Sequence, residues 1–144
     1  MKKDDFNLQD FLPYLLNRAA EESSLEFQKL YKDRYGMLRN EWRVLFHLGN
    51  NGEMTAKQIG DQARLHKTKI SRAVHRLEER RYLQRSRSAT DRRVENLALT
   101  ALGRSVYHEL CEIAGQYDTR LAAQFSEDEA ALLRKMLHRL AHMV

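Results

Sequence analysis

The chain has 144 residues, of which 42% are hydrophobic and 31% charged, with a formal net charge of +5. These values fit one globular domain with a single core, and no apolar run approaches the roughly 20 residues of a membrane span. The lone cysteine, Cys111, excludes an internal disulfide, and no signal-like stretch follows Met1. We therefore expect a cytoplasmic protein that does not contact a membrane.

Helical periodicity dominates the N-terminal part of the chain. Apolar residues recur at helical spacing and predict a long helix over residues 8–33. Pro13 is tolerated only in the first turn of a helix, so we expect this helix to begin near Asp10. Gly36 should end the segment.

Three short helices are predicted next. The first covers residues 40–48, with Trp42, Leu45, Phe46 and Leu48 inside, and a turn follows at Asn50–Gly52. The segment Thr55–Gln58 has the form of a capping box, so a second helix should begin there. Its inward residues should be Ala56, Ile59 and Ala63. The third helix is predicted over residues 67–80, with an apolar face at Ile70, Ala73, Val74 and Leu77.

The periodicity then changes to that of strands. Residues 82–87 and 94–99 alternate, and residues 88–93 form a polar, charged tip between them. This pattern predicts a β-hairpin. Further on, Thr100 should cap a helix that reaches about residue 124, and Ser126–Glu129 has the form of a second capping box before a last helix. The expected fold is mainly α with a small β-hairpin.

Positive charge is concentrated between residues 64 and 93. That segment has eleven Lys and Arg against three acidic residues, a net charge of +8, whereas the rest of the chain has a net charge of −3. Such a patch is typical of proteins with a polyanionic partner. A solvated helix face followed by a loop is the alternative interpretation.

Three short helices followed by a hairpin form the pattern of a winged helix-turn-helix. We therefore expect the helix at 67–80 to enter the major groove of double-stranded DNA. Its predicted DNA contacts are Lys67, Thr68, Lys69, Ser71, Arg72 and Arg76. The hairpin, or wing, suits phosphate and minor-groove contact, where arginine is favoured. Its predicted contacts are Arg87, Asp91, Arg92 and Arg93.

From Glu41 to Gly103 the chain resembles the MarR family of winged-helix transcriptional regulators. The resemblance is carried by Trp42, Leu45, Ile59-Gly60, the run from Thr68 to Val74, and Leu77-Glu78. Its most specific part is the wing, with Asp91-Arg92-Arg93 followed by Leu97-Ala98-Leu99-Thr100-Ala101-Leu102-Gly103.

Two positions depart from the family pattern. Arg39 stands where a capping Ser or Thr is frequent, which leaves the capping role to Asn40. Arg81 stands where Gly is frequent, which argues against a simple left-handed stop after the third short helix.

The resemblance implies a homodimer, a pseudo-palindromic operator and repression that is relieved by a small molecule, often an aromatic acid. It also implies that Arg93 reaches the minor groove and that Asp91 pairs with an arginine to hold the wing tip. The expected organisation is an N-terminal dimerisation helix (1–38), a winged helix-turn-helix (39–99) and C-terminal dimerisation helices (100–144) in one compact domain.

Candidates for an effector pocket are Tyr14, Arg18, Trp42, Phe46 and His47. Aromatic residues at helical spacing belong more often to a plain core, and a partly buried core histidine is the more frequent role for His47.

Metal and redox sites have little support in the sequence. His138 and His142 have a spacing that can bind a metal on a helix, but no cysteine or acidic cluster accompanies them. No metal and no cofactor is predicted. Cys111 is interpreted as a buried, inert thiol.

An enzyme is not predicted, because the sequence has no Gly-rich phosphate loop and no nucleophile elbow. Two alternatives stay open: a winged-helix adaptor that contacts proteins without specific DNA binding, and a metal- or redox-responsive regulator of the same fold. The concentrated positive charge argues against the adaptor, since protein interfaces are depleted of lysine.

Overall fold

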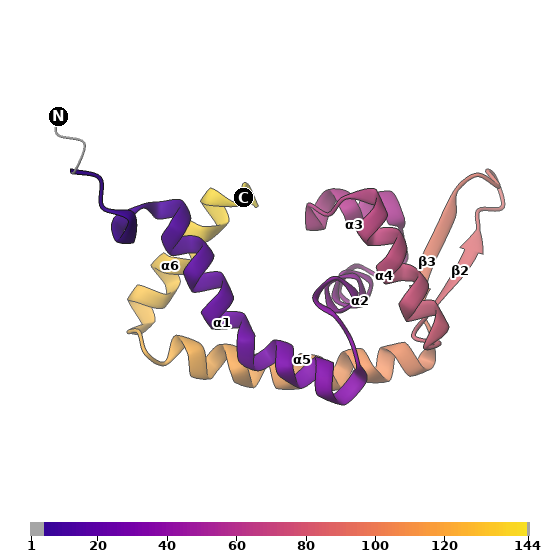
Figure 1. Cartoon of the computed structure of the whole chain (residues 1–144). Coiled ribbons are helices and arrows are strands. Elements are labelled where there is room, and N and C mark those ends of the chain that lie inside the picture. Colours follow the sequence, from indigo (N-terminus) through magenta and orange to yellow (C-terminus); the bar gives the residue numbers. More distant parts are fainter. Residues whose placement is uncertain (1–4, 144) are drawn as a thin grey trace. The chain divides into compact units, whose positions relative to one another are not determined.

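A computed structural model describes residues 5–143 (Figure 1). In chain order the elements are the 3-10 helix η2 (Leu8–Asp10), α1 (Leu12–Tyr35), α2 (Arg39–Asn51), β1 (Met54–Thr55), α3 (Ala56–Ala63), α4 (Lys67–Glu79), β2 (Leu83–Arg87), β3 (Glu95–Leu99), α5 (Ala101–Ala122) and α6 (Glu127–Leu140). The mainly helical prediction with a small hairpin is confirmed. None of the helices in the described part is long and apolar enough to cross a membrane.

The chain forms two compact units, Met1–Cys111 and Glu112–Val144, and α5 contributes to both. The first unit holds the short helices, the sheet and the N-terminal half of α5. The second holds the rest of α5 and α6. The three-part division expected from the sequence stays a prediction.

Helix α1 begins at Leu12 rather than near Asp10. Asn7 explains the difference, because its side chain accepts a hydrogen bond from the Gln9 amide at 3.1 Å and caps the separate helix η2. Pro13 lies in the first turn of α1, as its missing amide requires.

The C-terminal end of α1 is joined to the end of α4. Gly36 ends α1 with a φ of 65°, a backbone conformation that glycine adopts without strain. The Arg80 guanidinium lies over Gly36 and donates a hydrogen bond to the Tyr35 carbonyl. This contact ties the last turn of α1 to the residue that follows α4.

Helix α2 is longer than predicted and is capped differently. Leu38 precedes it, and the buried Glu41 carboxylate accepts the Leu38 amide at 3.1 Å. Asn40 therefore lies inside the helix, and the expectation that it caps α2 is wrong. Leu45 and Leu48 are buried as predicted, whereas Trp42 and Phe46 are only partly buried.

The capping box of α3 is confirmed. The Thr55 hydroxyl accepts the Gln58 amide at 3.1 Å, and the Gln58 side-chain oxygen accepts the Thr55 amide at 2.9 Å. Ile59 and Ala63 are buried as predicted. Ala56 is exposed instead, because it lies in the first turn and faces a surface groove.

Helix α4 buries the predicted face: Ile70, Ala73, Val74 and Leu77 are at most 3% exposed. The C-terminal end of α4 contradicts the expectation that Arg81 would prevent a left-handed stop there. Arg81 itself adopts the left-handed conformation, with a φ of 65°. Its amide donates to Glu78 at 2.9 Å, and the next amide, of Tyr82, donates to Leu77 at 2.9 Å.

We expect Arg81→Gly to stabilise the protein by about 1 kcal/mol, because a left-handed conformation costs a side-chain-bearing residue roughly that much. Urea denaturation followed by circular dichroism measures the change. Lys29→Gly, in the exposed interior of α1, is the matched control and should destabilise by about 1 kcal/mol. An equal loss of stability at Arg81 would contradict the prediction.

The sheet has three antiparallel strands in the order β1-β3-β2. The hairpin pairs Leu83 with Leu99 and Arg87 with Glu95 at its two ends. The short strand β1, which the sequence did not predict, pairs Met54 with Leu97. Figure 1 shows the hairpin projecting beside α4.

The two C-terminal capping predictions are confirmed. The Thr100 hydroxyl accepts the Gly103 amide at 3.0 Å before α5, and the Ser126 hydroxyl accepts the Glu129 amide at 3.1 Å before α6. Helix α6 ends at Leu140, so His142 lies beyond it with a φ of 56°. The expected helical spacing of the two histidines is therefore wrong.

Cys111 is half-buried, so the expectation of a buried thiol is wrong in degree. Groups of three or more potential metal ligands are absent among residues 5–143.

Candidate nucleic-acid interface

The outward face of α4 presents every residue that the sequence predicted for DNA reading. The residues are Lys67, Thr68, Lys69, Ser71, Arg72 and Arg76, and all are exposed. They point outward because α4 buries its apolar stripe against the core. His66 caps the N-terminus of α4, and its Nδ1 accepts the Thr68 amide at 3.2 Å. The first turn therefore presents hydroxyl groups and cations together.

The C-terminal half of this face continues the positive charge. Arg72, Arg76 and Arg80 border an open depression together with His75 and Glu79. His75 Nε2 lies 3.0 Å from a Glu79 carboxylate oxygen, which offsets part of the charge at that end. The cationic character of the face is therefore strongest toward its N-terminal half.

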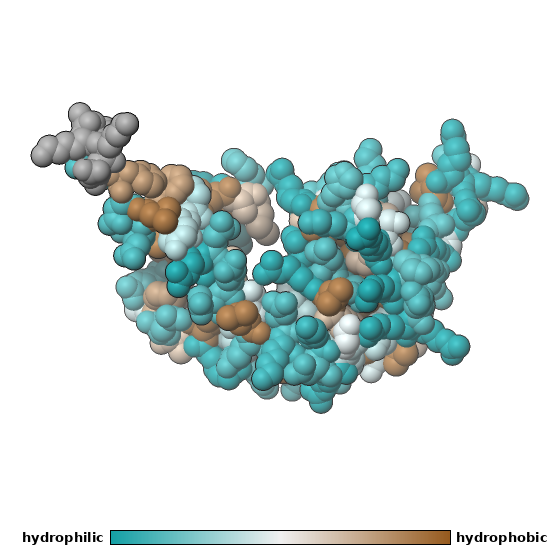
Figure 2. Space-filling view, viewed as in Figure 1, coloured by the Kyte–Doolittle hydropathy of each residue, from teal (hydrophilic) through white to brown (hydrophobic). Residues whose placement is uncertain are grey.

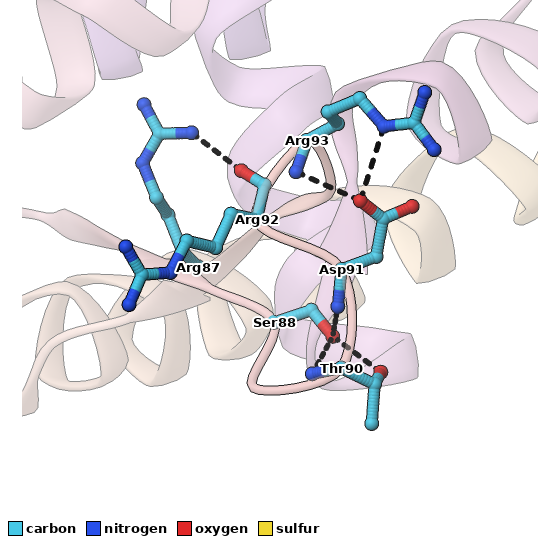
Figure 3. A network of polar contacts seen from close by, with 6 residues as sticks. All are labelled: Arg87, Ser88, Thr90, Asp91, Arg92 and Arg93. Carbon is cyan, nitrogen blue, oxygen red and sulfur yellow. Dashed lines mark hydrogen bonds and ion pairs between the residues drawn. The ribbon is translucent and has the colours of Figure 1, made fainter.

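The wing tip is organised by hydrogen bonds within six residues (Figure 3). Asp91 Oδ1 accepts the Arg93 backbone amide at 3.0 Å and the Arg93 Nε–H at 3.3 Å. The Ser88 hydroxyl accepts the amides of Thr90 and Asp91 at 3.3 and 3.4 Å. Arg87 donates to the Arg92 carbonyl at 2.6 Å. The tip is thus a turn in which short polar side chains satisfy the backbone.

This turn leaves cationic groups on the surface. The Arg93 side chain is 93% exposed despite its contact with Asp91, and Arg92 is also exposed. A carboxylate that folds the turn from inside while guanidinium groups stay accessible fits a segment that meets a phosphate backbone.

Arg85, at the base of the wing, was not singled out by the sequence. Its guanidinium lies between Glu78 of α4 at 3.0 Å and Glu95 of β3 at 2.7 Å. The hydrogen bond to Glu95 is the main cause of its raised pKa. Arg85 therefore joins the wing to α4, and tertiary structure alone reveals this role.

A separate cavity of about 370 Å³, open to solvent, lies between α1 and α2. Its lining residues are Ala20, Ser23, Ser24, Phe27, Tyr31, Arg39, Trp42 and Arg43. Trp42 is shared with the effector pocket predicted from the sequence. The other four predicted residues, Tyr14, Arg18, Phe46 and His47, do not line it.

Those four residues have other surroundings. Arg18 lies 3.5 Å from the Tyr14 hydroxyl on the exposed start of α1. Phe46 stacks on Trp42 with a centroid distance of 5.0 Å and an interplanar angle of 17°. His47 is half-buried, and burial lowers its pKa.

The cavity combines aromatic walls with cations. Trp42 packs edge-on against Phe27 and Tyr31, at 5.6 and 6.0 Å between ring centroids. Its indole Nε1 is buried without a hydrogen-bond partner in the described structure. Burial, and then the charge of nearby Arg39, lower the pKa of Arg43. The lining residues include two arginines and no acidic residue.

Two pairs of residues in the sequence carry a signal for this cavity. Phe27 and Tyr31 are four residues apart in α1, and Arg39 and Arg43 are four apart in α2. Each pair shares one helix face. Their meeting depends on how α1 and α2 pack.

The fold and the exposed basic surface define a winged helix-turn-helix DNA-binding protein. A family model described as "MarR family" matches residues 35–94. The regulator MhqR of Bacillus subtilis is 31% identical over 127 residues, which are 88% of this chain and 86% of MhqR. The repressor IacR of Pseudomonas putida is 26% identical, covering 96% of this chain and 83% of IacR.

Solved structures agree with the sequence matches. The MarR family regulator SPO1453 from Silicibacter pomeroyi superimposes with a TM-score of 0.84 at 27% identity, covering 96% of this chain and 98% of that one. The chain belongs to the MarR family of DNA-binding transcriptional regulators. It is therefore a regulator and not an enzyme, as the sequence predicted.

Proposed function

We propose that this protein is a sequence-specific repressor that binds a pseudo-palindromic operator as a homodimer and leaves it when an aromatic acid binds. The exposed cationic face of α4 beside the basic wing carries this proposal. The relative IacR is named a repressor, which favours repression over activation. A repressor that binds an operator would act where the chromosomal DNA is, which is the expected cytoplasm.

The two parts of the surface have different tasks in this proposal. Lys69 and Arg72 donate to guanine edges, and Thr68 and Ser71 contact bases or phosphates in the major groove. Arg93 enters the adjacent minor groove, and Arg87 and Arg92 contact phosphates. Two copies of α4 would occupy successive major grooves about 10 bp apart.

The homodimer is supported by apolar side chains that each unit leaves exposed. Figure 2 shows such side chains gathered at the N-terminal end of α1. In the first unit they include Phe6, Leu8, Phe11, Leu12 and Leu15, and in the second Phe125, Leu132, Met136, Leu137 and Leu140. Exposed patches of this kind mark interaction surfaces. A second copy of the chain is the partner that the family membership favours.

The effector proposal rests on the chemistry of the cavity between α1 and α2. Aromatic walls accept a planar ring, and two guanidinium groups attract a carboxylate. A volume of about 370 Å³ is within the range that small molecules occupy. An aromatic carboxylic acid satisfies all of these features at once.

DNA binding is tested by selection of bound sequences from random duplexes, followed by affinity measurement against salt. We expect an enriched palindromic sequence and a steep fall in affinity with salt, because cationic side chains release counterions from phosphates. A flat salt response without an enriched sequence would refute the proposal and favour the protein-contacting adaptor.

The assembly is tested separately by light scattering of the full chain. Twice the chain mass of 17.0 kDa supports the homodimer. A monomer mass across the micromolar range would refute it.

A further inference from the structure

Arg43 lies between the cavity and the end of α3, two features that membership of the family does not by itself link. Its side chain lines the cavity between α1 and α2, and its Nη2 donates to the Ala63 carbonyl oxygen at 2.6 Å. Ala63 is the last residue of α3. Arg64 follows with a φ of 57° and turns the chain toward α4, which begins at Lys67. One side chain therefore joins the cavity to the turn of the helix-turn-helix.

The contact has a clear physical effect on α3. The last carbonyls of a helix lack partners within the helix, and they carry the negative end of its dipole. A guanidinium that donates to one of them forms a charge-assisted hydrogen bond, which is stronger than a neutral one. Arg43 thus stabilises the end of α3 and fixes where the turn to α4 begins.

The second cavity arginine offers a comparison on the same helix. Arg39 Nη2 donates to the Ser24 hydroxyl of α1 at 3.2 Å, so its hydrogen bond stays beside the cavity. Arg43 reaches out of the cavity to α3. Both arginines line the cavity and contribute to its positive charge. Arg39 forms its hydrogen bond with α1, whereas Arg43 forms its hydrogen bond with α3.

A carboxylate in the cavity would compete with the Ala63 carbonyl for Arg43. A carboxylate is charged and can accept two parallel hydrogen bonds from one guanidinium, whereas a backbone carbonyl is neutral. The aromatic walls around Trp42 would hold the ring of the acid close to both arginines. Binding would therefore favour a form in which Arg43 turns from α3 to the ligand.

We propose that Arg43 is a positioning residue: it holds the end of α3 in the DNA-binding form, and an aromatic carboxylate releases that hold. The proposal rests on the proposed effector site and adds how occupancy of that site reaches α4. In thermodynamic terms, Arg43 carries the coupling between acid binding and DNA binding.

The test compares the full-length wild type with Arg43→Met and with Arg39→Met as matched control. The probe is 4-hydroxybenzoate, and its neutral isostere 4-hydroxybenzamide tests the need for the charge. The only tryptophan of the chain, Trp42, reports binding by fluorescence. Fluorescence anisotropy gives the DNA affinity without acid and at saturating acid.

We expect saturating acid to weaken DNA binding of the wild type at least about fivefold, the lower end of typical allosteric coupling. Arg39→Met should bind the acid more weakly, but saturating acid should weaken its DNA binding by the same factor as in the wild type. Arg43→Met should bind DNA more weakly than the wild type when no acid is present. Saturating acid should then weaken its DNA binding less than about twofold. Arg43→Lys, which keeps a charged donor, should restore part of both properties.

Hydrogen exchange gives a readout that does not depend on DNA. The Arg64 and Leu65 amides donate to Gly60 at the end of α3. Both should exchange faster in Arg43→Met and in the acid-bound wild type than in the free wild type. Unchanged exchange in Arg43→Met would overturn the hold on α3.

The outcomes separate the two proposals. If the wild type binds the acid and releases DNA but Arg43→Met shows the same factor, the coupling role of Arg43 is wrong and the proposed function stands. If the acid does not change Trp42 fluorescence, or the amide acts equally, the proposed effector and the release step are both overturned. Exchange at Arg64 and Leu65 then still decides whether Arg43 holds α3.

Discussion

Gly103→Ala is expected to destabilise the protein by about 3 kcal/mol, near the upper end of what overpacking costs. A Cβ atom at Gly103 would lie 2.7 Å from the carbonyl carbon and 3.1 Å from the Cα of Tyr82, and it would collide with the carbonyl oxygen. The obstacle is backbone, so no side-chain rotation relieves it. Helix α5 would have to move away from the residue that precedes β2.

The same movement would break a local network. The Thr100 amide donates to the Tyr82 carbonyl at 3.0 Å, and the Thr100 hydroxyl donates to the Arg81 carbonyl at 2.6 Å. Both bonds fix the start of α5 against the chain that links α4 to the wing. We therefore expect Gly103→Ala to weaken DNA binding as well.

Chemical denaturation of Gly103→Ala beside Gly115→Ala tests the steric account. Gly115 also lies in α5, but a Cβ there meets nothing within 4 Å. Gly115→Ala should stabilise the protein by about 1 kcal/mol, since alanine is the better helix former. Similar changes in stability at both positions would show that helix propensity, and not the contact with Tyr82, determines the effect of the substitution.

Arg72→Ala is expected to lower affinity for the selected operator about 10- to 100-fold, corresponding to roughly 1–3 kcal/mol for a bidentate base contact. Arg72 is exposed on the reading face of α4, one turn before Arg76. Its backbone position is fixed by Ile70, Ala73 and Val74, which are buried on the opposite face of the same helix. The substitution removes a base-reading donor without creating a cavity in the core.

Specificity distinguishes the two possible roles of Arg72. If it reads a base, the preference at one operator position relaxes while affinity for random duplex falls only slightly. A uniform loss on all sequences with a smaller salt dependence would instead make Arg72 a phosphate contact. Lys29→Ala, on the exposed face of α1 and outside the basic segment, should leave operator affinity unchanged.

Strong local patterns made α4 and the wing predictable. Ile70, Ala73, Val74 and Leu77 lie close together in angle on one side of a short helix, and such a stripe buries almost wherever the helix packs. Thr55, Thr100 and Ser126 act within one turn of their own helix, so their capping roles follow from sequence spacing. These features depend on neighbours in the chain and on little else.

The features that the sequence missed depend on tertiary packing. Strand β1 has two residues, too few for an alternating pattern, and exists because Met54 meets Leu97. Arg81 shows that packing can hold a residue other than glycine in a left-handed turn. Arg39 and Arg43 line a cavity only because α1 packs against α2. The spacing of residues within either helix does not predict how the two helices pack.

The pairing of β1 with β3 also has a consequence for how the protein folds. It brings together residues at the start of α3 and at the end of the wing, and it closes a loop that contains both α3 and α4. Contacts of high sequence separation form late and slow the folding reaction. We expect α3, α4 and the hairpin to unfold as one cooperative segment, so a truncation that removes β3 would leave no folded reading helix behind.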